Sequence, residues 1–456
     1  MYKKNDNIRL EVEENILIKG MNYMKFIKKY TYTILKHLCV LLTLTFIYTA
    51  SLGITYTFPK KNITKNIKSS VRILKKEGEG YSSFFTIPKL VRATKYDNFT
   101  DSKLLNVALD KEENASIMEK IVKNAYYQSS SSKQITNLDQ ALKEDTKVNS
   151  EYIRYWFGSE TVIKFLLIFT DLAGIRYINI MLLSLLFIYV LYLISKKIET
   201  KYAVAYAISI LLMNFWIIPM SLQYAPVMYI TLIATIAVIA LYNSKYKEKL
   251  PYLFFIIGSC TAFFDLLTYP LITLGYPVII LILLKSKYEE NNNIRETIFY
   301  WGKLAIIWGI AYGITYVTKW ALASAVYGQD YFTKSFEQLF FRMDMDGAEK
   351  YSKKDVIYRN LKCYFHLYNC ILLGIAAICS LPMIIKKFDK TKLKLITILP
   401  LLACSIAPYI WYVVLANHSY IHCWMTYRIQ GITVFGILSI ILSAVNMEKN
   451  KKLLPK

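Results

Sequence analysis

Long apolar runs alternate with short polar segments along most of the chain. Ten of these runs are candidates for membrane-spanning helices, each of which needs about 20 mostly apolar residues. They lie at 33–55, 176–194, 202–218, 227–242, 252–267, 271–284, 301–317, 370–385, 393–415 and 429–445. A basic stretch, KFIKKY, precedes the first run, which lacks a small-residue cleavage site and is therefore interpreted as a retained helix. The pattern predicts an all-α, polytopic integral membrane protein with about ten transmembrane helices.

Composition agrees with a chain that alternates between lipid and water. Of 456 residues, 55% are hydrophobic, 15% aromatic and 19% charged. That is too apolar for a soluble domain of this size and too charged for a chain embedded throughout. The formal net charge of +24 comes from Lys and Arg spread over many short segments between apolar runs. This distribution indicates membrane lipids as a partner and no nucleic acid.

The short loops differ sharply in their content of cations. Five segments, KKIETK, KYKEK, KSKYEENNNIR, KKFDKTKLK and the tail after Val445, hold 18 Lys or Arg residues in total. The three alternate loops, IPMSLQY, TYP and NHSYIHCWMTY, hold none. Because short cytoplasmic loops retain cations, the asymmetry predicts a multi-pass protein of the cell membrane with both termini cytoplasmic.

This orientation defines a single membrane domain, 1–456, with long extracytoplasmic loops at 56–173 and 320–367. In the first loop, SKLLNVALDKEENASIMEKIVKNAYY has apolar residues at helical spacing, which predicts amphipathic helices that could form a lid at the membrane rim. Glu160 and Lys164, at i and i+4, are expected to pair on a helix that precedes the second span.

The seven cysteines show no CxxC spacing, and most lie inside apolar runs. This pattern predicts neither a metal site nor a disulfide framework. Cys363 and Cys370 could pair if the exterior is oxidising, but a helix that enters the membrane between them is the simpler interpretation.

Four polar clusters fall on the predicted outer side, where ionisable groups at the membrane boundary are costly and therefore suggest function. Carboxylates beside Arg and His under a lid suit transfer of a group from a lipid-phosphate carrier to a hydroxyl. A carboxylate would accept the hydroxyl proton, and the cations would neutralise the leaving phosphate. The candidate catalytic residues are Asp97 and Asp101 of YDNFTD and Asp265 of FFDLLTYP, and the candidate substrate-binding residues are Arg154 and Trp156 of RYWFGSE and His418, His422 and Arg428 of NHSYIHCWMTYR.

The order of these features resembles the GT-C class of membrane glycosyltransferases, which have one span, a long outer loop with an acidic motif, many further spans and a late His and Arg motif. The motifs YDNFTDSKLLNVAL, RYWFGS, FFDLLTYPLITLGYP and NHSYIHCWMTYR also resemble those of multi-span proteins of low-GC Gram-positive bacteria. The resemblance covers 33–446.

The resemblance implies a polyprenyl-phosphate-linked sugar donor, a cell-envelope glycan or lipid acceptor, and no cofactor. It places the catalytic carboxylate on Asp97 or Asp101, and donor-phosphate contacts on Arg428 with His418 or His422. The chain departs from many GT-C enzymes in one respect, because about 40 residues separate its first span from the acidic motif.

Each cluster also has a structural interpretation. YDNFTD is typical of a turn and helix cap, and Asp265 could cap a turn before Tyr-Pro. Arg176 and Lys164 could anchor to lipid headgroups. Two histidines at i and i+4, as in NHSYIHCW, could bind a metal, but no HExxH motif accompanies them. The stretch FRMDMDGAEKYSKKD resembles a calcium loop without EF-hand spacing. A transporter or flippase of envelope lipids, and a non-catalytic scaffold, are the alternative functions.

Overall fold

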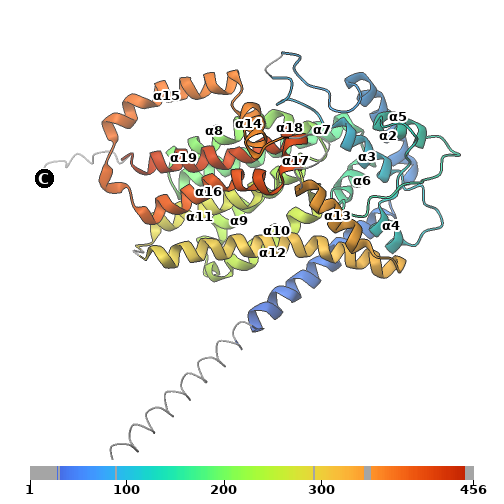
Figure 1. Cartoon of the computed structure of the whole chain (residues 1–456), viewed down its shortest axis with the longest axis horizontal. Coiled ribbons are helices and arrows are strands. Elements are labelled where there is room, and N and C mark those ends of the chain that lie inside the picture. The colour runs from blue at the N-terminus through green and yellow to red at the C-terminus, as the bar shows by residue number, and fades with distance from the viewer. Residues whose placement is uncertain (1–27, 29–30, 88–89, 291–292, 344–350, 447–456) are drawn as a thin grey trace, which may run out of the picture. The chain divides into compact units, whose positions relative to one another are not determined.

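The computed structural model describes residues 28, 31–87, 90–290, 293–343 and 351–446 (Figure 1). The chain divides into two compact units, Met1–Ile47 and Tyr48–Lys456. The described residues of the first unit are helical. They belong to an apolar helix, Thr31–Thr55, which covers the first predicted span.

The second unit is built from helices, and its described residues contain isolated β-bridges but no strand. Five helices occupy the first long loop: α2 (Lys60–Glu77), α3 (Asn98–Ala108), α4 (Ile117–Lys123), α5 (Gln134–Ala141) and α6 (Glu160–Leu167). The chain continues with α7 (Leu172–Lys197), α8 (Thr200–Leu211), η1 (Phe215–Met220), α9 (Ala225–Tyr242), η2 (Lys247–Lys249), α10 (Leu250–Phe264), α11 (Ile272–Tyr288) and α12 (Ile294–Tyr327). It ends with α13 (Tyr331–Met343), α14 (Lys353–Tyr364), α15 (Leu367–Lys387), η3 (Lys390–Lys392), α16 (Leu395–Val414), α17 (Ala416–Ile421), α18 (Cys423–Thr426), η4 (Tyr427–Gln430) and α19 (Gly431–Ser443).

The apolar helices confirm the all-α class and the membrane character of the chain. Seven helices in the described part are long and apolar enough to cross a bilayer. All ten predicted runs contain helix, but three of them form shorter helices: α8 has 12 residues, α10 has 15 and α11 has 17. Helix α19 itself has 13 residues and reaches a spanning length only together with α18 and η4, as Cys423–Ser443. At a rise of about 1.5 Å per residue, a helix of 12 residues covers about 18 Å, which is less than the apolar core of a bilayer. The count of ten therefore stays a prediction.

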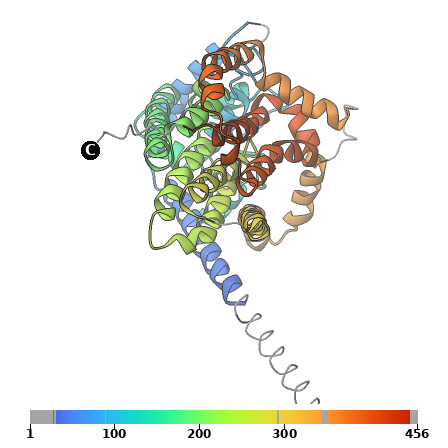
Figure 2. The same cartoon turned by 90° about the vertical axis from the view of Figure 1, so that its left-hand side faces the viewer.

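Long helices pack closely along their lengths. Helices α16 and α19 run side by side (Figures 1 and 2). At the contact between α10 and α12, a Cβ atom on Gly258 would lie 2.3 Å from the carbonyl oxygen of Trp308. The absence of a side chain at Gly258 is therefore what lets the two backbones approach.

The helices of the first long loop share an apolar core, which also contains Leu222, Leu267 and Leu415 of the later chain. Ile67 and Leu74 of α2, Leu104 of α3 and Leu138 of α5 are each fully buried in one apolar cluster. Helix α4 begins with a capping box, in which Ser116 and Glu119 satisfy each other's backbone N–H groups. The amphipathic pattern predicted helices in this loop, and the structure has them; their place at the membrane rim and their role as a lid stay predictions.

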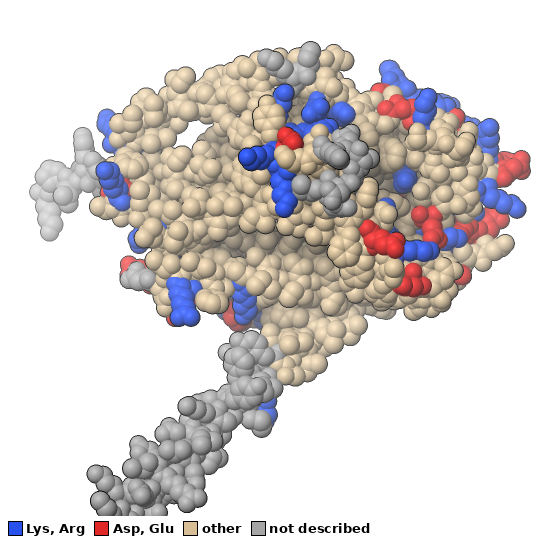
Figure 3. All heavy atoms as spheres, in the orientation of Figure 1, with Lys and Arg blue, Asp and Glu red and all other residues tan. Residues whose placement is uncertain are grey.

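The described parts of the five basic segments meet at one end of the helices. Lys287 donates to the carbonyl of Ile198 at 2.7 Å, and Lys201 donates to the carbonyl of Val445 at 2.8 Å. Lys247 forms an ion pair with Glu289. On the face shown in Figure 3, basic groups occur at this end, further basic groups lie near the middle of the face, and mixed charges lie over α2 to α6. The side of the membrane on which this end lies stays a prediction.

Candidate functional site

The YDNFTD motif forms the start of α3. Asp97 is the N-cap, and its Oδ1 accepts a hydrogen bond of 2.9 Å from the backbone N–H of Thr100. Asp101 lies one turn further on, and its Oδ1 accepts from Ser221 Oγ at 3.0 Å and Leu222 N at 2.9 Å. Both carboxylates are fully buried, and neither Oδ2 has a hydrogen-bond partner within the described residues. The motif is therefore a helix cap, as its structural interpretation predicted, yet each carboxylate keeps an oxygen for another group.

Burial changes the acidity of both carboxyl groups. It raises the pKa of Asp97 to about 7, against the hydrogen bonds from Thr100. Burial also raises the pKa of Asp101 well above its usual value, and the charge of Asp97 adds to that rise while Arg176 opposes it. Asp97 therefore exchanges its proton near neutral pH, which suits a general base.

Arg428 lies in η4 and is fully buried. Its Nη1 donates to the carbonyl of Trp424 at 2.9 Å, while Nε and Nη2 have no partner within the described residues. Among those residues it forms no ion pair with a carboxylate; its guanidinium carbon lies 4.5 Å from the ring centre of Tyr224 and 4.8 Å from that of Tyr427. A buried guanidinium with two idle donors is prepared to bind an anion.

Tyr224 joins the carboxylates to Arg428. Its ring faces the guanidinium, and Asp97 and Asp101 are both among its charged neighbours. The Tyr224 hydroxyl is buried and has no partner in the described structure. The site thus holds two carboxylates and an arginine near one tyrosine, with polar atoms that have no partner within the described residues.

Asp265 follows the end of α10 and organises the next turn. Its Oδ1 accepts from the backbone N–H of Thr268 at 2.9 Å and from the Thr268 hydroxyl at 2.5 Å. Within this turn Leu267 has a positive φ of 66°, a conformation that is unfavourable for a bulky residue. Tyr269 then donates to the carbonyl of Tyr224 at 2.6 Å. These bonds fit the interpretation of Asp265 as a cap, and they connect its turn to the tyrosine beside Arg428.

The two histidines adjoin this turn, with 4.8 Å between their ring centres. His418 bonds to the carbonyl of Leu267 through Nε2 at 2.7 Å, and Arg342 of α13 bonds to its Nδ1 at 2.7 Å. Burial lowers the pKa of His418 well below its usual value and that of His422 to about 4, and Arg342 contributes to both. No group of three or more metal-binding side chains occurs in the described part of the chain.

Beside Arg342 lies a cavity of about 380 Å³. Arg154 also lines it, and its Nη1 donates to the side chain of Gln338 at 2.7 Å. Most of the remaining wall is apolar or aromatic, contributed by Tyr155, Leu267, Tyr312, Tyr316, Val317, Trp320, Phe336, Leu339, Met343, Trp411, Val414 and Leu415. The cavity combines two cations with an apolar wall, which suits an amphipathic anion.

Three predicted side chains have structural partners instead. Trp156 is fully buried, and its indole N–H donates to the carbonyl of Thr315 at 2.8 Å, away from the cavity lining. Arg176 forms an ion pair with Glu77 and does not extend to the surface. Lys164 is buried with its Nζ 4.0 Å from the ring centre of Tyr56, and no ion pair joins it to Glu160.

Cys363 and Cys370 do not form a disulfide bond. All seven cysteines are free, and Cys370 donates to the carbonyl of Phe365 at 3.3 Å. Cys363 is instead near Cys423, with 3.8 Å between the sulfur atoms. The acidic positions of the calcium-like stretch between 344 and 350 lie outside the described residues.

Sequence reasoning missed Arg342, Tyr224 and Tyr269. Arg342 ends an amphipathic helix, where a cation is ordinary, and the two tyrosines belong to a chain with 38 of them. Only the packing of distant segments shows that these side chains join the predicted residues.

The fold and the site define an all-helical protein of the polytopic membrane class with a buried site of carboxylates, arginine and tyrosine. Comparison with protein-family models, with curated proteins and with solved structures finds no match.

Proposed function

We propose that the protein is a membrane glycosyltransferase that transfers a sugar from a polyprenyl-phosphate-linked donor to a cell-envelope acceptor on the extracytoplasmic side. One observation carries the proposal: two buried carboxylates, Asp97 and Asp101, and the buried Arg428 all lie near Tyr224 and have hydrogen-bonding atoms without a partner in the described structure. General-base catalysis needs a carboxylate, and stabilisation of a leaving phosphate needs a cation such as Arg428.

The chemistry is a displacement at the anomeric carbon of the donor sugar. An acceptor hydroxyl oxygen forms a bond to that carbon, and its proton passes to the carboxylate of Asp97 or Asp101. The bond from the anomeric carbon to the phosphate oxygen breaks, and the lipid phosphate leaves with the electron pair. Arg428, with Nε and Nη2 unused, neutralises the charge that develops on that phosphate.

The cavity beside Arg342 supports a lipid-linked donor. Its wall includes Trp320, Phe336 and Trp411, which suit the apolar chain of the donor. Asp97, Asp101 and Arg428 do not line this cavity, so the donor phosphate would lie beyond it, near Tyr224. In the predicted orientation the cavity opens on the outer side, where such a donor would be consumed.

The proposal is tested with membranes that contain the full chain and a labelled polyprenyl-phosphate hexose. Asp97→Asn and Asp101→Asn retain an oxygen that can accept the hydrogen bonds now made by Oδ1. At least one of them should lose about 10²–10⁴ in transfer rate, the usual contribution of a general base. Asp265→Asn, which retains the turn, is the matched control and should lose less. If both Asp97→Asn and Asp101→Asn transfer at the wild-type rate, the assignment is wrong.

A further inference from the structure

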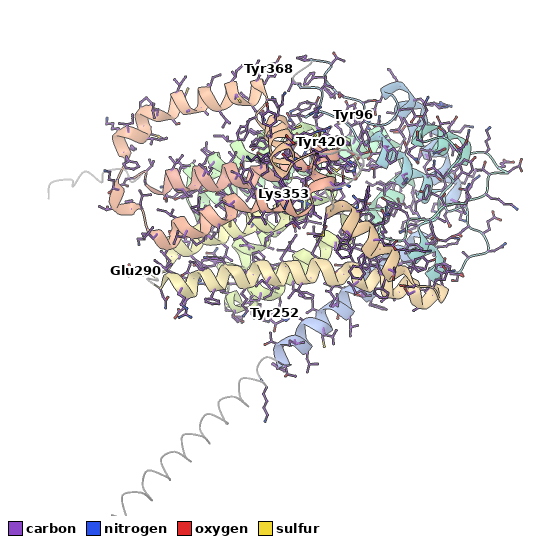
Figure 4. All side chains as sticks on the ribbon, viewed as in Figure 1. Tyr96, Tyr252, Glu290, Lys353, Tyr368 and Tyr420 are labelled. Atoms are coloured by element: carbon purple, nitrogen blue, oxygen red, sulfur yellow. The ribbon has the colours of Figure 1, made fainter. Side chains whose placement is uncertain are left out.

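A second, larger cavity, of about 670 Å³, shares no lining residue with the cavity beside Arg342. It lies between the chain that precedes α3 and the junction of α14 with α15. Figure 4 labels Lys353 of α14 and Tyr368 of α15 on either side of this junction. The lining residues are Val91, Arg92, Ala93, Lys95, Lys362, Cys363, Phe365, His366 and Leu367.

The charges around this cavity are all of one sign. Arg92, Lys95 and Lys362 line it, and Arg359 of α14 is a charged neighbour of Lys95. No Asp or Glu lines the cavity, and none of these four cations forms an ion pair within the described residues. Such a concentration of cations without carboxylate partners favours an anionic ligand.

Lys95 is more buried than the other two cations of the lining, because Arg92 and Lys362 are exposed. It is half-buried, and its Nζ lies 4.8 Å from the ring centre of Trp424 and 5.8 Å from that of Tyr81. Burial lowers its pKa, because the charged form loses part of its hydration there. A bound phosphate group would offset that loss.

The cavity adjoins the span with the least protein cover. Only 6% of the apolar window of α15 is buried, and the side chains of Leu367, Ile371 and Leu372 are exposed along it. Leu367 is both the first residue of α15 and part of the cavity wall, together with the apolar Val91 and Phe365. An apolar path therefore leads from the cations to the surface that faces lipid.

We propose that this cavity binds the phosphate headgroup of an anionic membrane lipid, whose acyl chains lie along α15. The head would contact Arg92, Lys95 and Lys362, and the first methylene groups would contact Val91, Phe365 and Leu367. A soluble phosphate ester would use the cations but not the apolar path, so a lipid accounts for both observations. The inference does not depend on transferase activity.

The test measures binding of phosphatidylglycerol to the full chain in a neutral detergent by native mass spectrometry. Arg92→Gln combined with Lys95→Gln should weaken binding at least tenfold, because two phosphate contacts are lost. Lys353→Gln combined with Lys354→Gln is the matched control, since it removes the same charge from exposed positions of α14 outside the cavity lining. That variant should bind within about twofold of the wild type.

A third variant, Lys362→Gln, changes an exposed side chain of the lining and should weaken binding even if the double variant fails to fold. Equal weakening by the Lys353 and Lys354 control would overturn the proposal, since the effect would then be general charge attraction. Inorganic phosphate at millimolar concentration should not displace the lipid. Full displacement would show a free-phosphate site and overturn the lipid assignment, whatever the transfer assay gives.

Discussion

Arg342 and His418 are joined by a hydrogen bond of 2.7 Å between Nη1 and Nδ1. Because a guanidinium only donates, Nδ1 must accept, and the imidazole proton is then on Nε2. That nitrogen donates to the carbonyl of Leu267 at 2.7 Å. One neutral tautomer of His418 therefore fixes Arg342 at the donor cavity and also holds the strained turn that Asp265 caps.

Neutral histidines at this position should make the fold sensitive to acid. The pKa of His418 is lowered well below its usual value, and that of His422 is lowered to about 4. Unfolded histidine has a pKa of about 6.5, so below that pH the unfolded chain binds protons that the folded chain refuses. The free energy of unfolding should be unaffected by these histidines above pH 6.5. Below that pH it should fall by up to about 1.4 kcal/mol per histidine for each pH unit.

This loss is measured as the apparent Tm of the protein in detergent between pH 7 and pH 5.5. His422→Gln is the informative variant, because it removes one of the two groups and leaves the bonds of His418 intact. It should show a smaller fall in Tm than the wild type over the same interval. An equal fall in both proteins would mean that His422 titrates normally in the folded state.

The membrane topology gives a prediction that does not depend on the site. The described parts of the basic segments meet at one end of the helices, and short basic loops stay in the cytoplasm. A reporter fused after Lys456 should therefore be cytoplasmic, and a reporter inserted at the exposed Ser130 should be outside. A cytoplasmic signal at Ser130 would also contradict the proposed function, because the lipid-linked donor is expected on the extracytoplasmic side.

Hydropathy predicted most helices because a lipid-facing span must satisfy its backbone internally and carry apolar side chains. The run 393–415, for example, became α16. The run 202–218 shows the limit of this reasoning. Its helix α8 ends at Leu211, Asn214 has a positive φ of 56°, and Pro219 lies within η1. Hydropathy did not predict this end of the helix, because it is averaged over a window of apolar residues and does not detect a single residue with a left-handed backbone conformation.

The candidate site was predictable only one segment at a time. YDNFTD identified Asp97 and the late motif identified Arg428, because charged residues near the ends of spans stand out in an apolar chain. Their meeting at Tyr224 depends on packing between segments far apart in the sequence. The role of Trp156 in packing against Phe263 could not be predicted either, since an interfacial tryptophan and a buried one look alike in sequence.

Arg428 should not tolerate replacement by lysine. Its Nη1 is fixed by the carbonyl of Trp424, which leaves Nε and Nη2 for a phosphate, whereas lysine has a single charged nitrogen. Arg428→Lys should raise the KM for the lipid-linked donor about tenfold or more, as expected for the loss of one charge-assisted hydrogen bond. Steady-state kinetics in membranes provide the measurement, with Arg72→Lys, a change of an exposed arginine of α2, as the control. Unchanged kinetics in Arg428→Lys would exclude Arg428 as the phosphate contact.

The pH dependence of transfer should identify which carboxylate is the base. Burial raises the pKa of Asp97 to about 7, and the charge of Asp97 helps to keep the proton on Asp101. A base works only when ionised, so the rate should rise about tenfold per pH unit below 7 and level off above about 8.

The two variants should then differ in their pH profiles. Asp101→Asn leaves Asp97 in place, so its residual activity should keep a midpoint near the pKa of Asp97, which is about 7. Asp97→Asn should instead lose the midpoint together with most of the rate, because the titrating group is gone. Initial transfer rates between pH 5.5 and pH 9 measure both profiles. A midpoint near 7 that survives in Asp97→Asn would assign the base to another group and leave Asp97 as the cap of α3 alone.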